Sequence, residues 1–362
     1  MNAIVQIRNL SKSYRIIRTT EYDKTNLPDT RSLSGQFIRL LLGESFNPFI
    51  KRREVALVKA LDNVNLDVNC GEILGLFGEN GSGKTTLLSV LGTMYPPDEG
   101  QITIFGYDYY KDQDKIRKVI IPMFCWLRDV RYDLTARQNI EYNLTLMKID
   151  PSKVKEHIDE VVSFFELDER VDDRIERFSG GMVIKVALTP FLIAYLVSEQ
   201  CLLLCDEPFV GLDLVTQEKL REFFLRNRKE NFAMILATHQ ARDVAVLCDR
   251  VAIIRQGKII GVDTPEKLIK TIIGKEVIHV EFTDAPQLNE KDFMDIHGVI
   301  NCRLSIDNST GYGKADIVVS NSRENMPEIV NVILRRGKIR TVFVETPTLE
   351  DALIHIMQSE KV

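Results

Sequence analysis

The chain has 362 residues, of which 44% are hydrophobic and 27% charged, so we expect two or three domains with a large core. A formal net charge of -5 gives nucleic acid no overall attraction, and six cysteines without paired or metal-ligand spacing predict reduced thiols. Met1–Leu10 alternates like a strand and not like a signal peptide. We expect no membrane-spanning segment, because the longest apolar run, Val186–Val197, is short and contains Thr189 and Pro190. Any role at a membrane must then act through a partner.

The N-terminal region combines a predicted edge strand, Ile4–Leu10, with an unusual segment at 15–60. Tyr14 offers a ring face on which adenine can stack, although surface packing is the plainer explanation of a lone tyrosine. Residues 15–60 carry nine Lys or Arg against five Asp or Glu, a net charge of +4, and an apolar cluster at Phe37–Leu42. A loop of this length is uncommon without a function, so a plain surface loop and a functional insertion both stay open.

Residues 78–86 carry the clearest signal in the chain. They read Gly-Glu-Asn-Gly-Ser-Gly-Lys-Thr-Thr, the G-x-x-x-x-G-K-[ST] pattern of a P-loop, between a short buried strand at 72–77 and a helix over Thr85–Leu91. Glycines let the backbone wrap closely around an anion, and successive N–H groups at the helix N-terminus then face the phosphates. The residues expected to contact the nucleotide are Gly78, Asn80, Gly81, Ser82, Gly83, Lys84, Thr85 and Thr86.

Two side chains of this loop have more specific expected tasks. Lys84 supplies a positive charge for the β- and γ-phosphates, so it counts as a catalytic as well as a binding residue. The hydroxyl of Thr85 is expected to bind Mg²⁺. A Gly-rich turn that matches by chance is the alternative.

Strands and helices follow on both sides of the loop. Leu61–Val68 alternates as a strand, Gln101–Phe105 reads as another, and Val119–Phe124 is an apolar run. Two later segments, Glu141–Leu146 and Val154–Phe165, have helical spacing.

Polar residues then stand at the ends of predicted elements. Ser179, Gly180 and Gly181 begin an apolar helix and form a second anion cradle, or simply a turn. The buried strand Cys201–Asp206 delivers Asp206 and Glu207 to the carboxyl edge of a parallel sheet, where the P-loop also lies. Asp206 is then expected to hold Mg²⁺, and Glu207 to orient the attacking water. An acidic helix cap is the alternative for either carboxylate alone.

The next strand, Ala233–Ala237, leads to His239, which can reach the γ-phosphate from a third strand end, although a lone histidine is more often structural. A hairpin around Gln256-Gly257 and a helix at Leu268–Ile273 end this part of the chain.

Five motifs, at 78–86, 178–182, 202–208, 211–213 and 238–240, stand in the order and approximate spacing of the ATP-binding cassette (ABC) family. The chain resembles that family over about residues 1–274. The resemblance implies an α/β P-loop NTPase fold with a RecA-like core, an antiparallel β subdomain and a helical subdomain near 128–185. It also implies ATP and Mg²⁺ as ligands and a head-to-tail dimer.

The resemblance also implies individual roles. Tyr14 becomes the adenine-stacking aromatic, Asp206 and Glu207 the Walker B pair, Asp213 the D-loop acid and His239 the switch histidine. In the implied dimer, the Ser179–Gly181 turn of one copy closes over ATP held by the P-loop of the other.

Two positions depart from the family pattern. The family has a glutamine roughly forty residues after the P-loop lysine, where Trp126 stands here, or Met123 in a second alignment. Neither side chain can supply the amide oxygen that would ligate Mg²⁺. Val183-Ile184-Lys185 also replaces a stretch that is usually more polar.

Residues 275–362 read as a separate domain with a ferredoxin-like βαββαβ order and a final helix, at 349–356. The stretch Phe343–Asp351 resembles the tail of drug-, lipid- and polysaccharide-exporting ABC ATPases. It holds no catalytic constellation, so we interpret it as a dimerisation or regulatory module, with a role in stability alone as the alternative.

The expected function is that of the ATP-hydrolysing subunit of an ABC exporter. Its partners would be separate transmembrane permease subunits and a second ABC subunit, with no nucleic acid, at the cytoplasmic face of the cell membrane. The resemblance to polysaccharide exporters suggests that 31–51 holds an amphipathic helix docked on those subunits. Packing of Phe37, Leu40 and Leu41 on the cassette's own β subdomain is the alternative. A soluble ABC ATPase and a catalytically weak regulatory subunit are the alternatives. The transported substrate does not follow from the sequence.

Overall fold

The computed structural model of the chain describes residues 3–20, 52–124, 130–272, 276–307, 312–345, 348–350 and 353. Trp126 lies outside the described residues, as do 21–51 with the apolar cluster Phe37–Leu42. The hypotheses on the missing glutamine and on a docking helix at 31–51 therefore stay predictions.

The N-terminal sheet is antiparallel and has the strand order β2-β1-β4-β5. Its strands are β1 (Ala3–Thr20), β2 (Arg52–Asn69), β4 (Glu99–Ile104) and β5 (Tyr107–Asp108). The prediction of an edge strand at Ile4–Leu10 is wrong, because β1 pairs with β2 on one side and β4 on the other. The β1–β2 ladder also continues out to Thr20 and Arg52, so both flanks of the 15–60 segment are strand and not loop.

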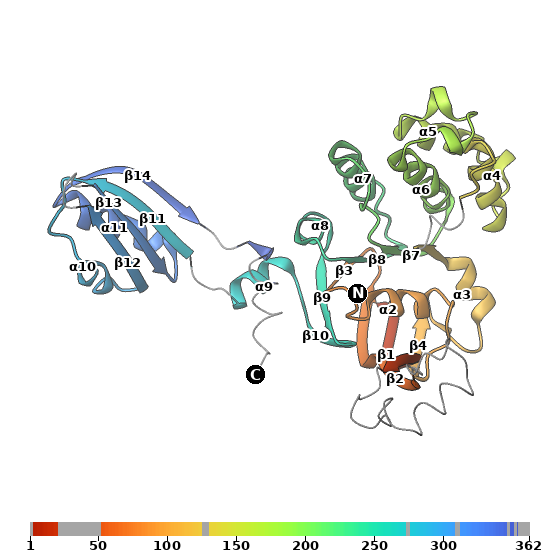
Figure 1. Cartoon of the computed structure of the whole chain (residues 1–362), viewed down its shortest axis with the longest axis horizontal. Coiled ribbons are helices and arrows are strands. Elements are labelled where there is room, and N and C mark those ends of the chain that lie inside the picture. Colours follow the sequence, from red (N-terminus) through yellow and green to blue (C-terminus); the bar gives the residue numbers. More distant parts are fainter. Residues whose placement is uncertain are drawn as a thin grey trace, which may run out of the picture.

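A six-stranded sheet forms the centre of the nucleotide-binding part, with the order β10-β9-β3-β8-β7-β6 (Figure 1). Its strands are β3 (Ile73–Phe77), β6 (Ile120–Met123), β7 (Cys201–Asp206), β8 (Phe232–Thr238), β9 (Arg250–Arg255) and β10 (Lys258–Asp263). All neighbours are parallel except β9 and β10. Phe77 pairs with Thr238, and Asp206 with Ala237, so β3, β7 and β8 end at one edge.

Both faces of the five strands from β9 to β6 are buried, which explains their nearly continuous apolar residues, whereas the edge strand β10 is half-buried. Along β7, Leu202 and Leu204 point into one hydrophobic cluster with α2 and the N-terminal sheet. Leu203 and Cys205 point into a second cluster, which holds the helical part of the chain. The expected parallel core strand is thus confirmed, and its two faces anchor two different subdomains.

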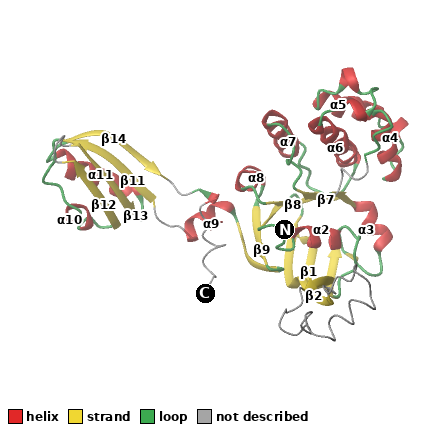
Figure 2. Cartoon of the chain, in the orientation of Figure 1, coloured by secondary structure: helices red, strands yellow, loops and turns green. Residues whose placement is uncertain are grey.

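Some helices of this part lie against the sheet, and others form a separate group beside it (Figure 2). The helices of this part are α2 (Lys84–Leu91), α3 (Gln113–Val119), α4 (Ala136–Leu146), α5 (Lys155–Phe164), α6 (Gly180–Val197), α7 (Leu214–Arg226), α8 (Ala241–Leu247) and α9 (Pro265–Ile272). Thr135 and Gln138 form a capping box that begins α4, because each side chain bonds the backbone N–H of the other.

Helix α6 corrects the expectation about membrane length. Its 18 residues have a mean hydropathy of 1.8, so by length and composition it is a candidate span, which is weak evidence alone. In the structure 61% of this window is buried inside the protein. Val183 and Ile184, the apolar residues after the signature, belong to the same buried cluster as α4 and α5. Their departure from the polar pattern is therefore explained by core packing.

The C-terminal module contains a four-stranded antiparallel sheet with the order β12-β13-β11-β14. Its elements are β11 (Glu276–Thr283), α10 (Lys291–Met294), β12 (Val299–Asp307), β13 (Tyr312–Val319), α11 (Ser322–Leu334) and β14 (Lys338–Glu345). This is the predicted βαββαβ order, with its own hydrophobic cluster. Leu349 and Leu353, beyond the module, are instead buried in the cassette cluster, which includes one face of the six-stranded sheet and Leu268 of α9.

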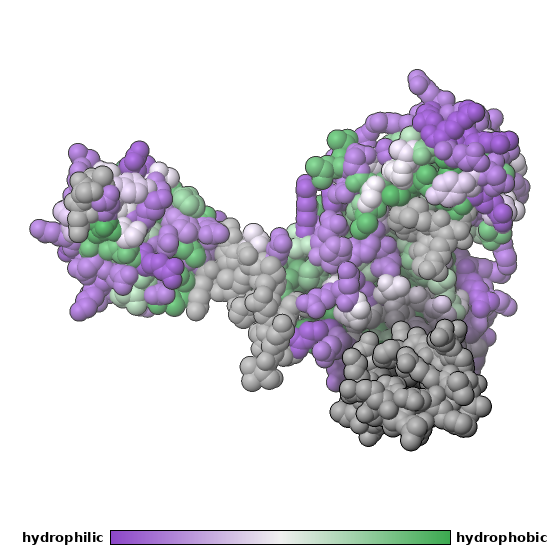
Figure 3. Space-filling model, viewed as in Figure 1, coloured by the Kyte–Doolittle hydropathy of each residue, from purple (hydrophilic) through white to green (hydrophobic). Residues whose placement is uncertain are grey.

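Hydrophilic side chains dominate the visible face of the molecule, with smaller hydrophobic areas between them (Figure 3). The five described cysteines are free; four are buried and Cys70 is half-buried. Burial raises the pKa of the Cys201 thiol to about 12, so this thiol stays protonated at neutral pH.

Candidate active site

The P-loop lies between β3 and α2, as its sequence predicts. Two of its glycines lie so close to neighbouring backbone that no side chain would fit. A Cβ on Gly78 would lie 2.3 Å from the Ile254 carbonyl oxygen, and one on Gly83 would lie 2.6 Å from the Ala60 oxygen. Gly83 also has a φ of 112° and serves as the N-cap of α2 without a side-chain hydrogen bond. The helix N-terminus is thus left open for an anion.

Lys84 lies across this loop. Its ammonium donates hydrogen bonds to the carbonyl oxygens of Gly78, at 2.6 Å, and Glu79, at 3.1 Å. Burial lowers the pKa of Lys84, while the nearby charges of Glu207 and Asp206 act in the opposite direction. The lysine therefore places a positive charge between the loop and the Walker B carboxylates.

The expected metal ligands meet at the carboxyl edge of the sheet. The Thr85 hydroxyl donates to Asp206 Oδ2 over 2.6 Å, so the two oxygen donors are adjacent. Among the described residues, no group of three His, Cys, Asp or Glu side chains could hold a metal ion. A pair of hard oxygens without a full cage fits Mg²⁺, which keeps water and phosphate oxygens in most of its positions.

Glu207 stands next to Asp206 in a left-handed backbone conformation with a φ of 51°. This conformation costs a residue other than glycine free energy, and it occurs in this chain at turns such as Lys148 and Glu166 as well as at the candidate site. Glu207 Oε1 lies 2.6 Å from His239 Nδ1, so the structure brings the predicted water-orienting acid and the switch histidine together. The His239 side chain is half exposed and Glu207 is more enclosed.

Glu207 and the P-loop line a cavity of about 510 Å³, and neither His239 nor Gly78 is among its lining residues. The predicted residues that line it are Asn80, Gly81, Gly83, Lys84, Thr85, Thr86, Asp206 and Glu207. Ser82 is instead buried, and its hydroxyl is an unpaired side-chain polar atom among the described residues.

Sequence reasoning missed two parts of the wall, Val58–Ala60 on β2 and Gln256-Gly257 in the β9–β10 turn. Gly257 N–H donates to the Ser82 carbonyl at 2.8 Å, and Asp62 N–H donates to the Gly257 carbonyl at 2.9 Å. The sequence predicted the hairpin turn at Gln256-Gly257. Its contact with the P-loop could not be predicted, because it requires β9 to lie next to β3 in the sheet.

A second group of predicted residues lies elsewhere, at the start of α6 and α7. Ser179 caps α6 by accepting the Met182 N–H at 3.4 Å, and a Cβ on Gly181 would lie 3.7 Å from the Gly211 oxygen. Asp213 caps α7 by accepting the N–H and hydroxyl of Thr216, and these hydrogen bonds lower its pKa to about 2. None of these residues lines the cavity.

Tyr14 is not among the cavity residues either. It is half-buried on β1, and its ring meets that of Tyr95 edge-on, with centroids 6.1 Å apart. It lies opposite Val58, which does line the cavity. The adenine-stacking role stays a prediction.

A P-loop after β3, with an Asp-Glu pair at the end of β7, a parallel strand separated from β3 by β8, defines the class of P-loop nucleoside triphosphatases. Comparison with known proteins specifies the family. Residues 61–210 match the family model described as ABC transporter. The ABC transporter ATP-binding protein NatA of Bacillus subtilis is 31% identical over 204 residues, which are 56% of this chain and 81% of that protein.

A longer match exists with the Nod factor export ATP-binding protein I of Rhizobium etli. It is 30% identical over 311 residues, which cover 84% of this chain and 90% of that protein. A dimeric structure of the ATP-binding cassette MJ0796 with ADP and Pi has a TM-score of 0.54 at 22% identity and covers 72% of this chain and 98% of its own. This chain belongs to the family of ABC transporter ATP-binding proteins, and it is an ATPase with the predicted α/β P-loop fold.

Proposed function

We propose that this chain is the ATP-hydrolysing subunit of an exporter. The observation that supports this direction is the extent of the match to the Nod factor export protein. An alignment over 84% of 362 residues must reach past the first 275 and into the C-terminal module. The Synechocystis sulfate/thiosulfate import protein, at 34% identity, and the Halalkalibacterium halodurans methionine import protein, at 30%, match only 58% and 56% of this chain.

The site residues support a division of work in hydrolysis. The P-loop backbone and Lys84 bind the phosphates, and Thr85 and Asp206 would hold Mg²⁺, which neutralises phosphate charge when it is bound. Glu207 orients and polarises the attacking water, and His239 holds the Glu207 carboxylate in place through the 2.6 Å contact. Such positioning and electrostatic stabilisation carry most of phosphoryl-transfer catalysis.

The second group of residues supports a dimer. Ser179–Gly181 and Asp213 lie outside the cavity of their own chain, and Ser179 and Gly180 are exposed. In a head-to-tail pair they would close over ATP bound by the other copy. Two such subunits would act on separate transmembrane subunits at the cytoplasmic face of the membrane, and Tyr14 would stack on adenine.

We further propose two units in each chain, a cassette at about 1–274 and an accessory module at 275–362. Separate hydrophobic clusters support the division. Leu349 and Leu353 refine it, because they are buried with the cassette and not with the module.

The test of direction uses inverted membrane vesicles that contain the chain and the membrane protein that co-purifies with it. With ATP outside, an exporter accumulates a labelled drug, lipid or saccharide in the lumen, and the same vesicles with Lys84→Ala do not. ATP-dependent loss of preloaded substrate from the lumen would instead indicate an importer.

A further inference from the structure

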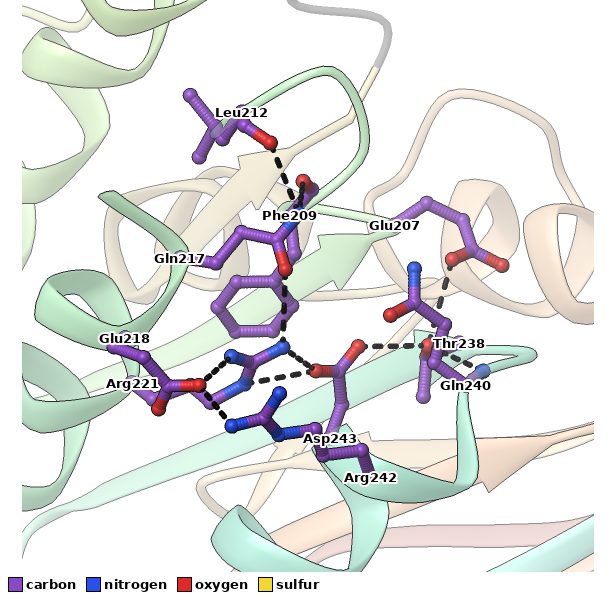
Figure 4. A network of polar contacts seen from close by, with 10 residues as sticks. All are labelled: Glu207, Phe209, Leu212, Gln217, Glu218, Arg221, Thr238, Gln240, Arg242 and Asp243. Carbon is purple, nitrogen blue, oxygen red and sulfur yellow. Dashed lines mark hydrogen bonds and ion pairs between the residues drawn. The ribbon is translucent and has the colours of Figure 1, made fainter. Parts of the chain in front are cut away.

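A pair of buried charges, Arg221 and Asp243, lies near Thr238 and Glu207 (Figure 4). The side chains of Arg221 on α7 and Asp243 on α8 are each 1% exposed. Arg221 Nε and Nη2 donate to Asp243 Oδ1 at 2.9 and 2.5 Å. Desolvation makes such a pair a weak source of stability compared with apolar residues of the same size. Its position therefore points to a task other than stability.

From Asp243 the contacts continue toward Glu207. Asp243 Oδ2 lies 3.2 Å from the Thr238 hydroxyl, and the same hydroxyl lies 3.4 Å from Glu207 Oε2. Thr238 is fully buried, and its oxygen accepts the Gln240 N–H at 3.0 Å, which fixes its place. The hydroxyl has one hydrogen to donate and two carboxylates within reach. The hydroxyl lies slightly closer to Asp243 than to Glu207, but the charge of Arg221 makes Asp243 the weaker acceptor, so Glu207 can compete for this hydrogen.

The guanidinium of Arg221 also supports the loop that leaves Glu207. It lies 4.8 Å from the centre of the buried Phe209 ring. Its Nη2 donates to the Gln217 side-chain oxygen at 3.4 Å, and the Gln217 amide donates to the carbonyl oxygens of Phe209 and Leu212 at 3.2 and 3.0 Å. One buried cation thus holds both the side chain of the catalytic acid and the backbone that follows it.

We propose that Arg221 is a positioning residue for ATP hydrolysis, which acts on Glu207 through Asp243 and Thr238. The inference rests on the proposed role of Glu207. Neither Arg221, Asp243 nor Thr238 lines the cavity, so their loss should reduce kcat while KM for ATP stays the same.

The first test is a matched pair at Thr238, measured as phosphate release by the full chain against ATP concentration. Thr238→Val keeps the shape and removes the hydroxyl, so we expect kcat to fall about tenfold or more with KM within twofold. Thr238→Ser restores the hydroxyl and should recover most of kcat. Equal kcat in the Val variant and the wild type would overturn the proposal, as would a Ser variant that is as slow as Val.

The second test replaces the charges themselves. Arg221→Met with Asp243→Leu is an apolar substitute for a buried pair, which generally preserves folding. If the pair served only stability, this double variant would keep its kcat. We expect a normal melting temperature, unchanged ATP binding and a kcat at least tenfold lower. Should this variant fail to fold, the Thr238 pair still decides the question.

Glu207→Gln distinguishes a failure of the proposed role of Glu207 from a failure of the proposed role of Arg221. Turnover that survives in this variant removes the proposed role of Glu207. Turnover that is lost in Glu207→Gln but complete in Thr238→Val leaves that role intact and removes the role of Arg221.

Discussion

Among the described residues, two histidines contact carboxylates, and only His239 does so at the candidate active site. His239 Nδ1 lies 2.6 Å from Glu207 Oε1. His279, in the C-terminal module, bonds Asp316 through Nδ1 and Glu345 through Nε2, each at 2.8 Å.

The surroundings separate the two histidines. Glu207 lines the cavity with the P-loop, and buried Thr238 and Asp243 support it from behind. His279 joins three strands of an antiparallel sheet and stacks on the exposed ring of Phe343, with centroids 4.7 Å apart. A histidine–carboxylate contact is therefore not a catalytic signal alone; its neighbours decide what it does.

Glu207→Gln tests the catalytic side of this comparison with the largest expected effect. The amide keeps the size of the side chain but loses the charge that polarises water. We expect a fall in kcat of about 100-fold or more, with ATP still bound, because positioned groups of this kind contribute on that scale. Phosphate release measures turnover, and size-exclusion with ATP should show an accumulated dimer. His279→Gln serves as the control, and it should keep wild-type turnover.

Leu353→Ala tests the boundary between the cassette and the C-terminal module through its effect on stability. This side chain is 1% exposed within the cassette cluster, although it follows the module in sequence. Leu353→Ala should destabilise the cassette by about 2–5 kcal/mol, the usual range for a buried leucine. Thermal unfolding with and without ATP identifies the cassette transition, which should shift to lower temperature. Exposed Glu350→Ala is the control, and a shift confined to the module transition would contradict the packing.

The sequence predicted which motifs come together at the candidate site better than it predicted what packs around them. The P-loop and the Asp206-Glu207 pair follow from local pattern, since buried parallel strands must end at a shared edge. No local sequence pattern identified Arg221, because its contact with Asp243 forms only when α7 and α8 pack together. The edge-strand prediction failed for β1 for a similar reason, since strand order depends on distant pairing with β2 and β4. In the module, the alternating strands were enough to predict the sheet.

Trp126→Gln should raise the ATPase activity, whereas Glu207→Gln should lower it, and the expected change is smaller. Trp126 lies outside the described residues, and the prediction depends on its place in the sequence. A glutamine would restore an amide oxygen where the family pattern has one, so we expect ATPase activity at low Mg²⁺ to rise a few-fold. The measurement is the rate against Mg²⁺ concentration. Met123, the alternative in the alignment, is fully buried in the core and does not line the cavity, so only Trp126 is changed. Superimposable curves for the wild type and Trp126→Gln would show that Trp126 does not serve the metal.

The smallest effect concerns His279 and the dependence of module stability on pH. Burial lowers its pKa, but the hydrogen bonds and charges of Asp316 and Glu345 outweigh burial, so the pKa lies above the usual 6.5. A raised pKa means that the folded module binds the proton more tightly than the unfolded chain. The stabilisation is therefore complete below about pH 6.5 and is lost as pH rises through the folded pKa.

Exposure limits the size of this effect. The Asp316 and Glu345 side chains are 50% and 68% exposed, so we expect about 1 kcal/mol or less. The neighbouring Lys314–Glu281 pair keeps its charges over pH 5.5–8.5 and contributes equally to both proteins compared. The melting temperature of the module should fall across that range in the wild type more than in His279→Gln. A difference between the two proteins that does not change with pH would mean that His279 only packs on Phe343, and that its two carboxylate contacts carry no proton-linked stability.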